Sequence, residues 1–145
     1  MAENTPQQIA DRVREGLFAN DRASKAMGMR VLDVTPGQAT VSMAVRPDML
    51  NGHDTCHGGI IATLADSAFA FACNSHGEMT VASGFSIDLV APAILGDVLT
   101  ARCTEVAKAG RTGVYDTDVS NQRGECIAVF RGRSHTVKGK PAVAG

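Results

Sequence analysis

The segment from Gly59 to Asn74 (GIIATLADSAFAFACN) most constrains the fold of this chain, because it is apolar or small almost all the way round. A helix of that composition is buried on every side, so other elements must wrap it. The chain has 145 residues, enough for one domain that buries a core without disulfides or structural metals. We therefore predict a single domain over residues 1–145, built round one central helix.

Strand-like runs flank this helix on both sides. A hairpin with a Pro36-Gly37 turn precedes it, and four longer runs follow it. The predicted strands are Val31–Val34, Ala39–Val45, Thr80–Val90, Asp97–Val106, Thr112–Asn121 and Glu125–Val137. Runs of strands with a single long helix favour an antiparallel sheet over βαβ units. The expected class is therefore α+β, with the helix wrapped by a strongly curved sheet of five or six antiparallel strands. The open edges of that sheet favour a dimer.

The two ends of the chain differ from this pattern. Apolar residues at helical spacing predict a helical extension over about 5–27, with a break and a new N-cap at Asn20-Asp21. The small-residue tail from about 139 to 145 is expected to be flexible.

The charge, the N-terminal sequence and the cysteine spacing argue against several partners and cellular locations. A net charge of −1 provides no electrostatic footprint for nucleic acid. The N-terminus lacks the apolar core of a signal peptide, and the longest apolar run is too short to span a bilayer. The four cysteines are widely spaced with no CxxC, which indicates reduced thiols. We expect a cytoplasmic protein with no membrane partner.

Asp66 is the first candidate functional residue, because it interrupts the most apolar stretch of the chain. Burying an ionised carboxylate costs several kcal/mol unless it is paired or hydrogen-bonded. Small or polar residues share its predicted helix face, namely Gly59, Ala62, Thr63, Ala70 and Asn74. This face leaves room for a ligand beside the carboxylate. Alternatively, Asp66 only specifies packing, and the small residues let another element approach closely.

The same helix opens with His57-Gly58-Gly59. Two glycines at a helix start let backbone N–H groups face an acceptor atom, and the helix dipole adds positive charge there. The arrangement can stabilise an oxyanion, although such pairs are also common in simple turns. Gly58 lies about 12 Å from Asp66 along one helix axis, by the 1.5 Å rise per residue. An extended substrate could span this distance, or a partner subunit could complete the site.

Two other readings of this region are open. His53, Cys56 and His57 have metal-ligand side chains, but their spacing is not that of a zinc site, and no distant Cys/His pair completes a tetrahedron. A Cys56–His57 nucleophile pair is also conceivable, although adjacent loop residues seldom face each other. We expect no metal. Asn51 is a turn residue by default, and its amide could instead hold a water or a carbonyl.

These motifs together resemble one known family. Asn51-Gly52-His53-x-x-Cys56-His57-Gly58-Gly59, followed by Asp66 in LADSAFAFACNS, resembles the phenylacetic acid degradation thioesterases of the hotdog-fold acyl-CoA thioesterase superfamily. VASGFSIDLVAPAILGDVLTA, RTGVYD and FRGRSH resemble it further, and the similarity covers roughly residues 26–139.

The resemblance implies a role for each matching residue. Asp66 corresponds to the catalytic carboxylate, acting as general base or nucleophile, and Gly58 to the backbone donor that polarises the thioester carbonyl. Gly59 keeps that turn open and His57 has an orienting role. Asn51 is similar to the amide that orients water or the carbonyl. Ser83 lies near a Ser or Thr position of some relatives.

The resemblance also implies the assembly and the reaction. A hotdog dimer places Asp66 of one subunit opposite the HGG turn of the other, with a homotetramer as the expected full assembly. The expected substrate is phenylacetyl- or hydroxyphenylacetyl-CoA, with coenzyme A as part of the substrate and no cofactor. Cations must meet the CoA phosphates, and the candidates are Lys108, Arg111, Arg131 and Arg133. The alternatives are a non-catalytic acyl-CoA binding module and an enoyl-CoA hydratase-like enzyme on the same fold.

Overall fold

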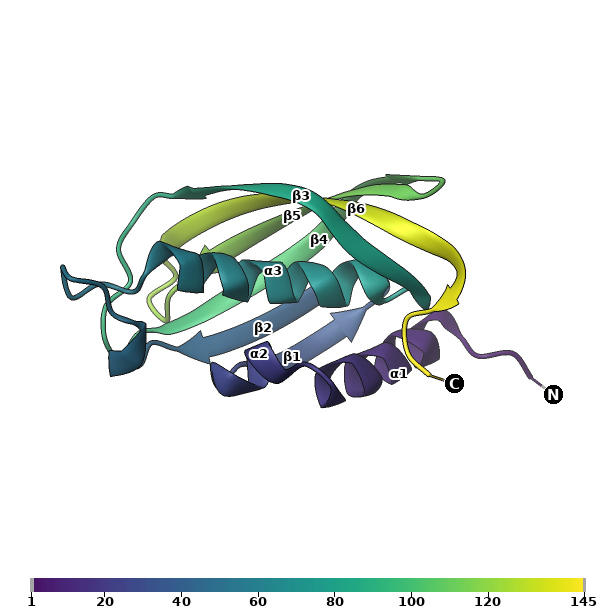
Figure 1. Cartoon of the computed structure of the whole chain (residues 1–145), viewed down its shortest axis with the longest axis horizontal. Helices are drawn as coiled ribbons and strands as arrows, with labels where there is room; N and C mark the ends of the chain where they lie inside the picture. The colour runs from purple at the N-terminus through teal and green to yellow at the C-terminus, as the bar shows by residue number, and fades with distance from the viewer. Residues whose placement is uncertain (1, 145) are drawn as a thin grey trace.

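The computed structural model describes residues 2–144, in which one six-stranded sheet curves over a long helix (Figure 1). Every strand pairs antiparallel to its neighbours. The elements are α1 (Pro6–Ala19), α2 (Arg22–Ala26), β1 (Arg30–Thr35), β2 (Gln38–Ala44), a 3-10 turn (Pro47–Met49), α3 (Gly58–Asn74), β3 (Glu78–Leu89), β4 (Val98–Ala109), β5 (Thr112–Ser120) and β6 (Cys126–Pro141). The predicted α+β class, the wrapped central helix and the six-stranded sheet are confirmed.

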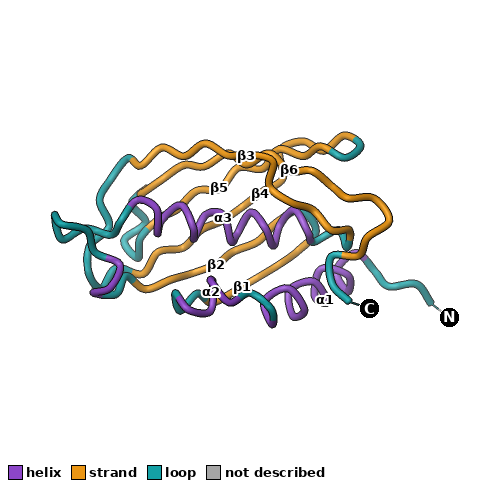
Figure 2. The backbone as a smooth tube through the Cα atoms, viewed as in Figure 1, coloured by secondary structure: helices purple, strands orange, loops and turns teal. Residues whose placement is uncertain are grey.

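The strand order is β1-β2-β4-β5-β6-β3. Strand β3 follows α3 directly in the chain but lies at the far edge of the sheet, so the hairpin β1–β2 and strand β3 lie on opposite sides of the meander. The two edge strands are therefore β1 and β3. Figure 2 shows that the N-terminal helix lies below β1, while β3 runs along the other border of the sheet.

The central helix packs into the sheet through large side chains on its buried side. The Phe69 ring lies 5.6 Å from the Tyr115 ring and 5.8 Å from the Phe130 ring, measured between centroids. Gly132 on β6 faces the same ring, and a Cβ atom there would lie 2.7 Å from Phe69 Cε2. Because Gly132 has no side chain, the Phe69 ring can pack directly against β6.

The N-terminal extension forms the two predicted helices. Thr5 caps α1 through a reciprocal pair of hydrogen bonds with Gln8. Asp21 caps α2, since its carboxylate accepts the Ser24 N–H at 3.0 Å. The Ser24 hydroxyl then lies 2.8 Å from the Ser67 hydroxyl on α3. This contact ties the extension to the central helix beside Asp66.

The C-terminal end departs from the expected flexible tail over 139–145. Strand β6 continues to Pro141, which pairs with Glu78, and the Ala142 N–H donates to the Gly77 carbonyl at 2.9 Å. Backbone hydrogen bonds to β3 and Gly77 therefore hold the chain as far as Ala142, within the part that the sequence suggested would fray. Gly145 lies outside the described residues.

Two further features bear on the expected environment. All four cysteines are unpaired thiols. Within residues 2–144, no helix is long and apolar enough to cross a membrane.

Candidate active site

One face of α3 is not covered by the rest of the chain. The residues on it are only partly buried or exposed: Gly59, Ala62, Thr63, Asp66 and Ala70. We call this set the helix stripe. It matches the predicted small-residue face except at Asn74, which is buried because its amide bonds both backbone groups of Thr80 at 2.9 Å. Asn74 therefore has a structural role, because its hydrogen bonds hold the end of α3 against β3.

Asp66 is half-buried in the middle of this stripe. Burial raises the pKa of its carboxyl, and the nearby negative charge of Asp21 raises the pKa further. No hydrogen-bond donor within residues 2–144 offsets these two effects. A carboxylate with a raised pKa takes up a proton more readily than an ordinary surface aspartate does. This is a property of a general base.

Gly58 presents a free backbone donor at the start of the helix. The Gly59 N–H is taken up by His57 Nδ1 at 3.2 Å, and the Ile60 N–H donates to the His57 carbonyl at 2.9 Å. Within residues 2–144, the Gly58 N–H has no acceptor. This N–H therefore combines an unused hydrogen bond with the positive end of the helix dipole, as an oxyanion donor requires.

His57 is the N-cap residue of α3. Its Nδ1 atom accepts a hydrogen bond, so the proton of the neutral imidazole lies on Nε2. The histidine ring fixes the glycine turn rather than facing Asp66. The orienting role of His57 in the reaction stays a prediction.

A cavity of about 320 Å³ adjoins the Gly58 turn. We call it the donor cavity, and its lining comprises Asn51, Thr55, Cys56, Gly58, Ile61, Leu89, Val90, Ala91 and Pro92. The amide of Asn51 lies in its wall but is occupied locally: Oδ1 accepts the His53 N–H at 2.9 Å, and Nδ2 donates to Thr55 Oγ1 at 3.1 Å. Asn51 therefore shapes the loop before the helix as well as lining the cavity.

The structure does not support the two alternative readings of this loop. Within residues 2–144, no three of the His, Cys, Asp and Glu side chains are grouped to hold a metal ion. Cys56 is buried, and burial raises the pKa of its thiol. Its sulfur points to the His57 carbonyl oxygen at 3.8 Å and not to the imidazole. A nucleophilic Cys–His pair is therefore absent.

Asp66 and Gly58 do not meet within one protomer. They are eight residues apart on one straight helix, about 12 Å along its axis. Strand β3 borders this region, because Leu89 Cδ1 would lie 2.6 Å from a Cβ atom at Gly58. The two groups can act on one thioester only if a second copy supplies one of them.

Ser83 lies in a bulge of β3, between residues 82 and 84, where the register to β6 shifts. Its hydroxyl donates to the Arg133 carbonyl at 3.1 Å. The bulge explains why the facing of Ser83 could not be read from strand alternation. The structure brings Ser83 to the β3 edge and not to the helix stripe.

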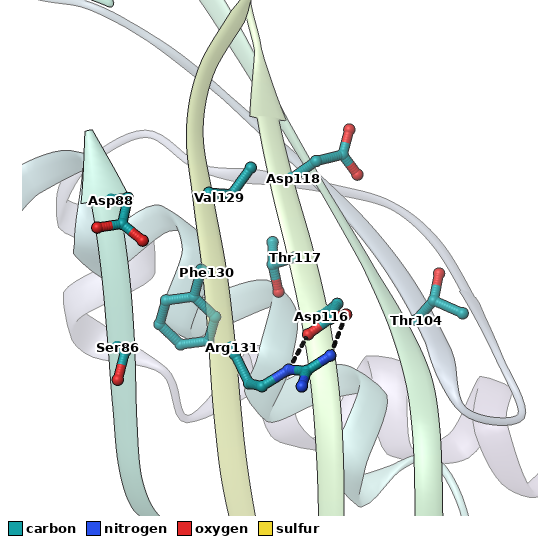
Figure 3. A pocket seen from close by; sticks show the side chains of 9 residues that line it. All are labelled: Ser86, Asp88, Thr104, Asp116, Thr117, Asp118, Val129, Phe130 and Arg131. Atoms are coloured by element: carbon teal, nitrogen blue, oxygen red, sulfur yellow. Dashed lines mark hydrogen bonds and ion pairs between the residues drawn. The ribbon is translucent and has the colours of Figure 1, made fainter. Parts of the chain in front are cut away.

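The predicted cationic residues lie elsewhere. Arg131 is on the outer face of the sheet, opposite α3, where its Nε and Nη2 atoms donate to Asp116 at 2.6 and 2.8 Å (Figure 3). Arg133 follows on the same face, with its guanidinium over Gly84. Arg111 is exposed in the β4–β5 turn, and Lys108 is exposed near the end of β4. The structure therefore does not bring these cations to the helix stripe.

The outer face also carries a cavity of about 380 Å³. Its lining includes the carboxylates of Asp88, Asp116 and Asp118, with Arg131 as the cation (Figure 3). The hydrogen bonds and charge of Arg131 hold the pKa of Asp116 below its usual range. Three carboxylates against one paired guanidinium disfavour a phosphate group, so this cavity does not suit the CoA nucleotide.

Asp21 is a neighbour of Asp66 that sequence reasoning assigned only to a helix cap. Asp21 and Asp66 are far apart in the chain. They come close because the neighbouring residues Ser24 and Ser67 join α2 to α3 through hydroxyls 2.8 Å apart. A single sequence does not reveal such a pair. The N-terminal extension therefore contributes directly to the electrostatics of the candidate site.

Comparison with known proteins indicates the family of this chain. The family model described as "Thioesterase superfamily" matches residues 53–128. The acyl-coenzyme A thioesterase PaaI of Escherichia coli (strain K12) is 45% identical over 123 residues, which cover 85% of this chain and 88% of that protein.

Solved structures agree with the fold. That of the E. coli PaaI protein from the phenylacetic acid degradation operon has a TM-score of 0.91 and 41% identity, covering 94% of this chain and 99% of that one. A Streptococcus mutans protein solved with bound acetyl CoA has a TM-score of 0.74 and 26% identity, covering 77% and 90% of the two chains. The hotdog fold is thus confirmed, and the chain belongs to the thioesterase superfamily as a thioester hydrolase related to PaaI.

Proposed function

We propose that this protein hydrolyses acyl-CoA thioesters, with arylacetyl-CoA (phenylacetyl- or hydroxyphenylacetyl-CoA) as its substrate class. The observation that carries the proposal is that α3 has both an oxyanion donor and a base: a free Gly58 N–H at its start and the half-buried Asp66 further along. The family and the PaaI relative supply the thioester class. The name of the structural relative, from a phenylacetic acid degradation operon, supports the arylacetyl group.

The chemistry needs only these two groups. Asp66 takes a proton from water as the water oxygen attacks the thioester carbon, or attacks that carbon itself. The carbonyl oxygen becomes an oxyanion that accepts a hydrogen bond from the Gly58 N–H. Collapse of the intermediate breaks the C–S bond and releases the CoA thiolate, which takes up a proton. In the general-base route this step gives the free acid directly. In the nucleophilic route it leaves the acyl group on Asp66 as an anhydride, which a water molecule then hydrolyses to the free acid and the Asp66 carboxylate. A thiolate leaves without strong general-acid help, so no further catalytic acid or cofactor is required.

The proposed catalytic unit is a homodimer in which Asp66 of one protomer faces the Gly58 turn of its partner. The separation of the two groups along one helix supports this arrangement. The open edge at β3, beside the donor cavity, provides the surface for pairing two copies. We extend the proposal to a cytoplasmic homotetramer built from two such dimers.

A thiol-release assay with phenylacetyl-CoA tests the proposal. Asp66→Asn keeps the side-chain volume but removes the base and the nucleophile, so turnover should fall about 10²-fold or more. Asp33→Asn, at an exposed carboxylate on β1, is the matched control and should retain wild-type turnover.

Each alternative has its own outcome in this assay. Full turnover by Asp66→Asn contradicts the assigned role. Binding of acyl-CoA without thiol release by the wild type indicates a non-catalytic module. Hydration of an enoyl-CoA, measured alongside, indicates the hydratase-like enzyme.

A further inference from the structure

Asp97 is a buried carboxylate that the proposed reaction does not use. Its side chain is 2% exposed and lies where the loop of residues 90–96, which we call the β3–β4 loop, enters β4. Resting on the proposed function, we propose that Asp97 is a positioning residue for thioester hydrolysis, which fixes the β3–β4 loop and through it the Gly58 N–H. Asp97 acts through hydrogen bonds and not by contact with the reacting atoms.

Asp97 closes the last turn of this loop with both its backbone and its side chain. The Asp97 N–H donates to the Ile94 carbonyl at 3.0 Å, and Asp97 Oδ2 accepts the Ile94 N–H at 3.0 Å. Gly96 lies inside the turn at a φ of 87°, a left-handed conformation that favours glycine. Both backbone polar groups of Ile94 are therefore bonded to Asp97, which fixes the turn from residue 94 to residue 97.

The carboxylate also fastens this turn to the rest of the sheet. Asp97 Oδ1 accepts a hydrogen bond from Gln122 Nε2 at 2.9 Å, and Gln122 Oε1 accepts the Val98 N–H at 2.9 Å. Arg123 Nη1 lies 3.5 Å from the same Asp97 oxygen. The hydrogen bonds from Ile94 and Gln122, with the charge of Arg123, hold the pKa of Asp97 below its usual range. The carboxylate therefore stays ionised at neutral pH and accepts from both donors.

One hydrogen bond connects the fixed turn to the start of α3. Ala93, directly before Ile94, is fully buried, and its carbonyl accepts the Cys56 N–H at 2.8 Å. Cys56 lies two residues before Gly58. A shift of Ala93 therefore moves the glycine turn that contains the oxyanion donor.

A second path begins at the backbone of Asp97. The N–H of Val45, which follows β2, donates to the Asp97 carbonyl at 2.8 Å, and the Val45 carbonyl accepts the Gly96 N–H at 3.1 Å. The chain then runs from Val45 into the 3-10 turn that ends at Met49. The Met49 carbonyl accepts the His57 N–H at 2.8 Å. Both segments that hold the start of α3 therefore meet at Asp97.

The placement of the Gly58 N–H determines how well it stabilises an oxyanion. Such a donor works only at hydrogen-bond distance from the position that the oxyanion will occupy. A displacement of about 1 Å at a reacting group can cost roughly 10²-fold in rate. Because the oxyanion forms only in the transition state, loss of an Asp97 hydrogen bond should lower kcat more than it changes KM.

Asp97→Asn tests the positioning role. The substitution keeps the size of the side chain, but its NH₂ group must face a donor, either the Ile94 N–H or Gln122 Nε2, so one hydrogen bond is lost. We expect kcat for phenylacetyl-CoA to fall about tenfold or more and KM to change less than about threefold. Tyr115→Phe is the matched control, since it removes one hydrogen bond of a buried side chain, to Glu105 at 2.8 Å, and should leave kcat unchanged. Equal losses of kcat in the two variants would overturn the proposal.

A second substitution restores the lost bond and separates positioning from simple destabilisation. When Gln122→Glu is added to Asp97→Asn, the introduced NH₂ group can donate to the introduced carboxylate, whose other oxygen accepts the Val98 N–H. The kcat of the double variant should return to within about threefold of the wild type, whereas Gln122→Glu alone places two carboxylates together and should lower kcat. A double variant no more active than either single variant overturns the proposal. Because Gln122 is exposed, its single variant keeps this comparison possible if Asp97→Asn does not fold.

Amide hydrogen exchange followed by NMR tests the same path without catalysis. In Asp97→Asn, the Cys56 N–H should exchange about tenfold faster or more relative to the Thr80 N–H, which Asn74 bonds at the other end of α3. An unchanged ratio overturns the positioning path. Faster exchange supports that path even in a protein without thioesterase activity, a result that contradicts only the proposed function.

Discussion

The two edge strands of the sheet differ in whether other parts of the chain cover them. Strand β1 is covered by α1: Gln7 Nε2 donates to the Val34 carbonyl at 2.9 Å, and Arg14 Nη2 donates to the Val31 carbonyl at 2.7 Å. These side chains satisfy backbone acceptors that would otherwise attract another strand. The N-terminal helix thereby closes one edge of the sheet to other chains.

Strand β3 has no comparable cover. Asn74 bonds the backbone of Thr80, but further along the strand Val81, Phe85 and Leu89 are 43%, 43% and 50% exposed. Phe85 stacks on Phe130 at 4.9 Å between centroids and leaves the rest of its ring uncovered. The difference leaves one edge of the sheet, β3, without cover, and this edge borders the helix stripe and the donor cavity.

The largest expected effect comes from placing a charge on the open edge. Phe85→Glu buries a carboxylate in the proposed β3 interface, so we expect the dimer to weaken by about 30-fold or more. Thiol release should fall in parallel at protein concentrations where the monomer dominates. Sedimentation velocity and the thiol assay measure the two effects on the same samples.

The covered edge supplies the control. Leu32 on β1 is 47% exposed, close to the value for Phe85, and Leu32→Glu should change neither the dimer nor the activity. A dimer that tolerates Phe85→Glu but dissociates with Leu32→Glu would reverse the comparison between the edges.

The next largest effect concerns how the Asp66 carboxyl changes the stability of the fold with pH. Burial and the charge of Asp21 raise the pKa of Asp66, so the folded protein binds a proton there more tightly than the unfolded chain does. This stabilises the fold at low pH, and the benefit is lost as pH rises above the ordinary value of 3.8. Asp66→Asn should therefore raise Tm relative to the wild type at pH 8 and leave it nearly equal at pH 3.

The exposed Asp33 on β1 again serves as the reference. Asp33→Asn, which removes one exposed carboxylate from β1, is scanned at both pH values as the control for the loss of a negative charge. A Tm for Asp66→Asn that falls below the wild type as pH rises contradicts the electrostatic description of the stripe.

The smallest effect comes from opening the covered edge. Arg14→Ala removes the hydrogen bond to the Val31 carbonyl and should lower the free energy of unfolding by about 1 kcal/mol. Urea unfolding measures this change. Activity and the dimer should persist, because α1 still covers β1 through its other contacts. A loss of the dimer would show that β1 also takes part in association.

Much of the fold could be predicted from residue patterns. The apolar run ending at Asn74 predicted the wrapped helix, and the run Glu125–Val137 predicted the last strand, which the structure has at Cys126–Pro141. Local hydrogen-bond chemistry also identified Asp21 as a cap. Such features depend on neighbours in the chain, so one sequence contains them.

Other features depend on contacts between distant segments. The bulge at Ser83 shifts the register of β3, and the neighbouring Gly84 is only a weak local signal of it. The side-chain partner of Arg131 is Asp116, which only the pairing of β5 with β6 brings near. The position of β3 at the sheet edge likewise follows from the order of all six strands. The cations could be named from sequence, but the pairing of Arg131 with Asp116 could not.

Gly132 shows how far such long-range control extends. The absence of a methyl group on β6 determines where the Phe69 ring rests, and Phe69 lies three residues after Asp66 on the same rigid helix. The helix cannot turn about its axis without driving that ring into the strand. The rotational setting of α3, and with it the direction of the Asp66 carboxylate, is thus fixed by an empty position on a strand at the other end of the sequence.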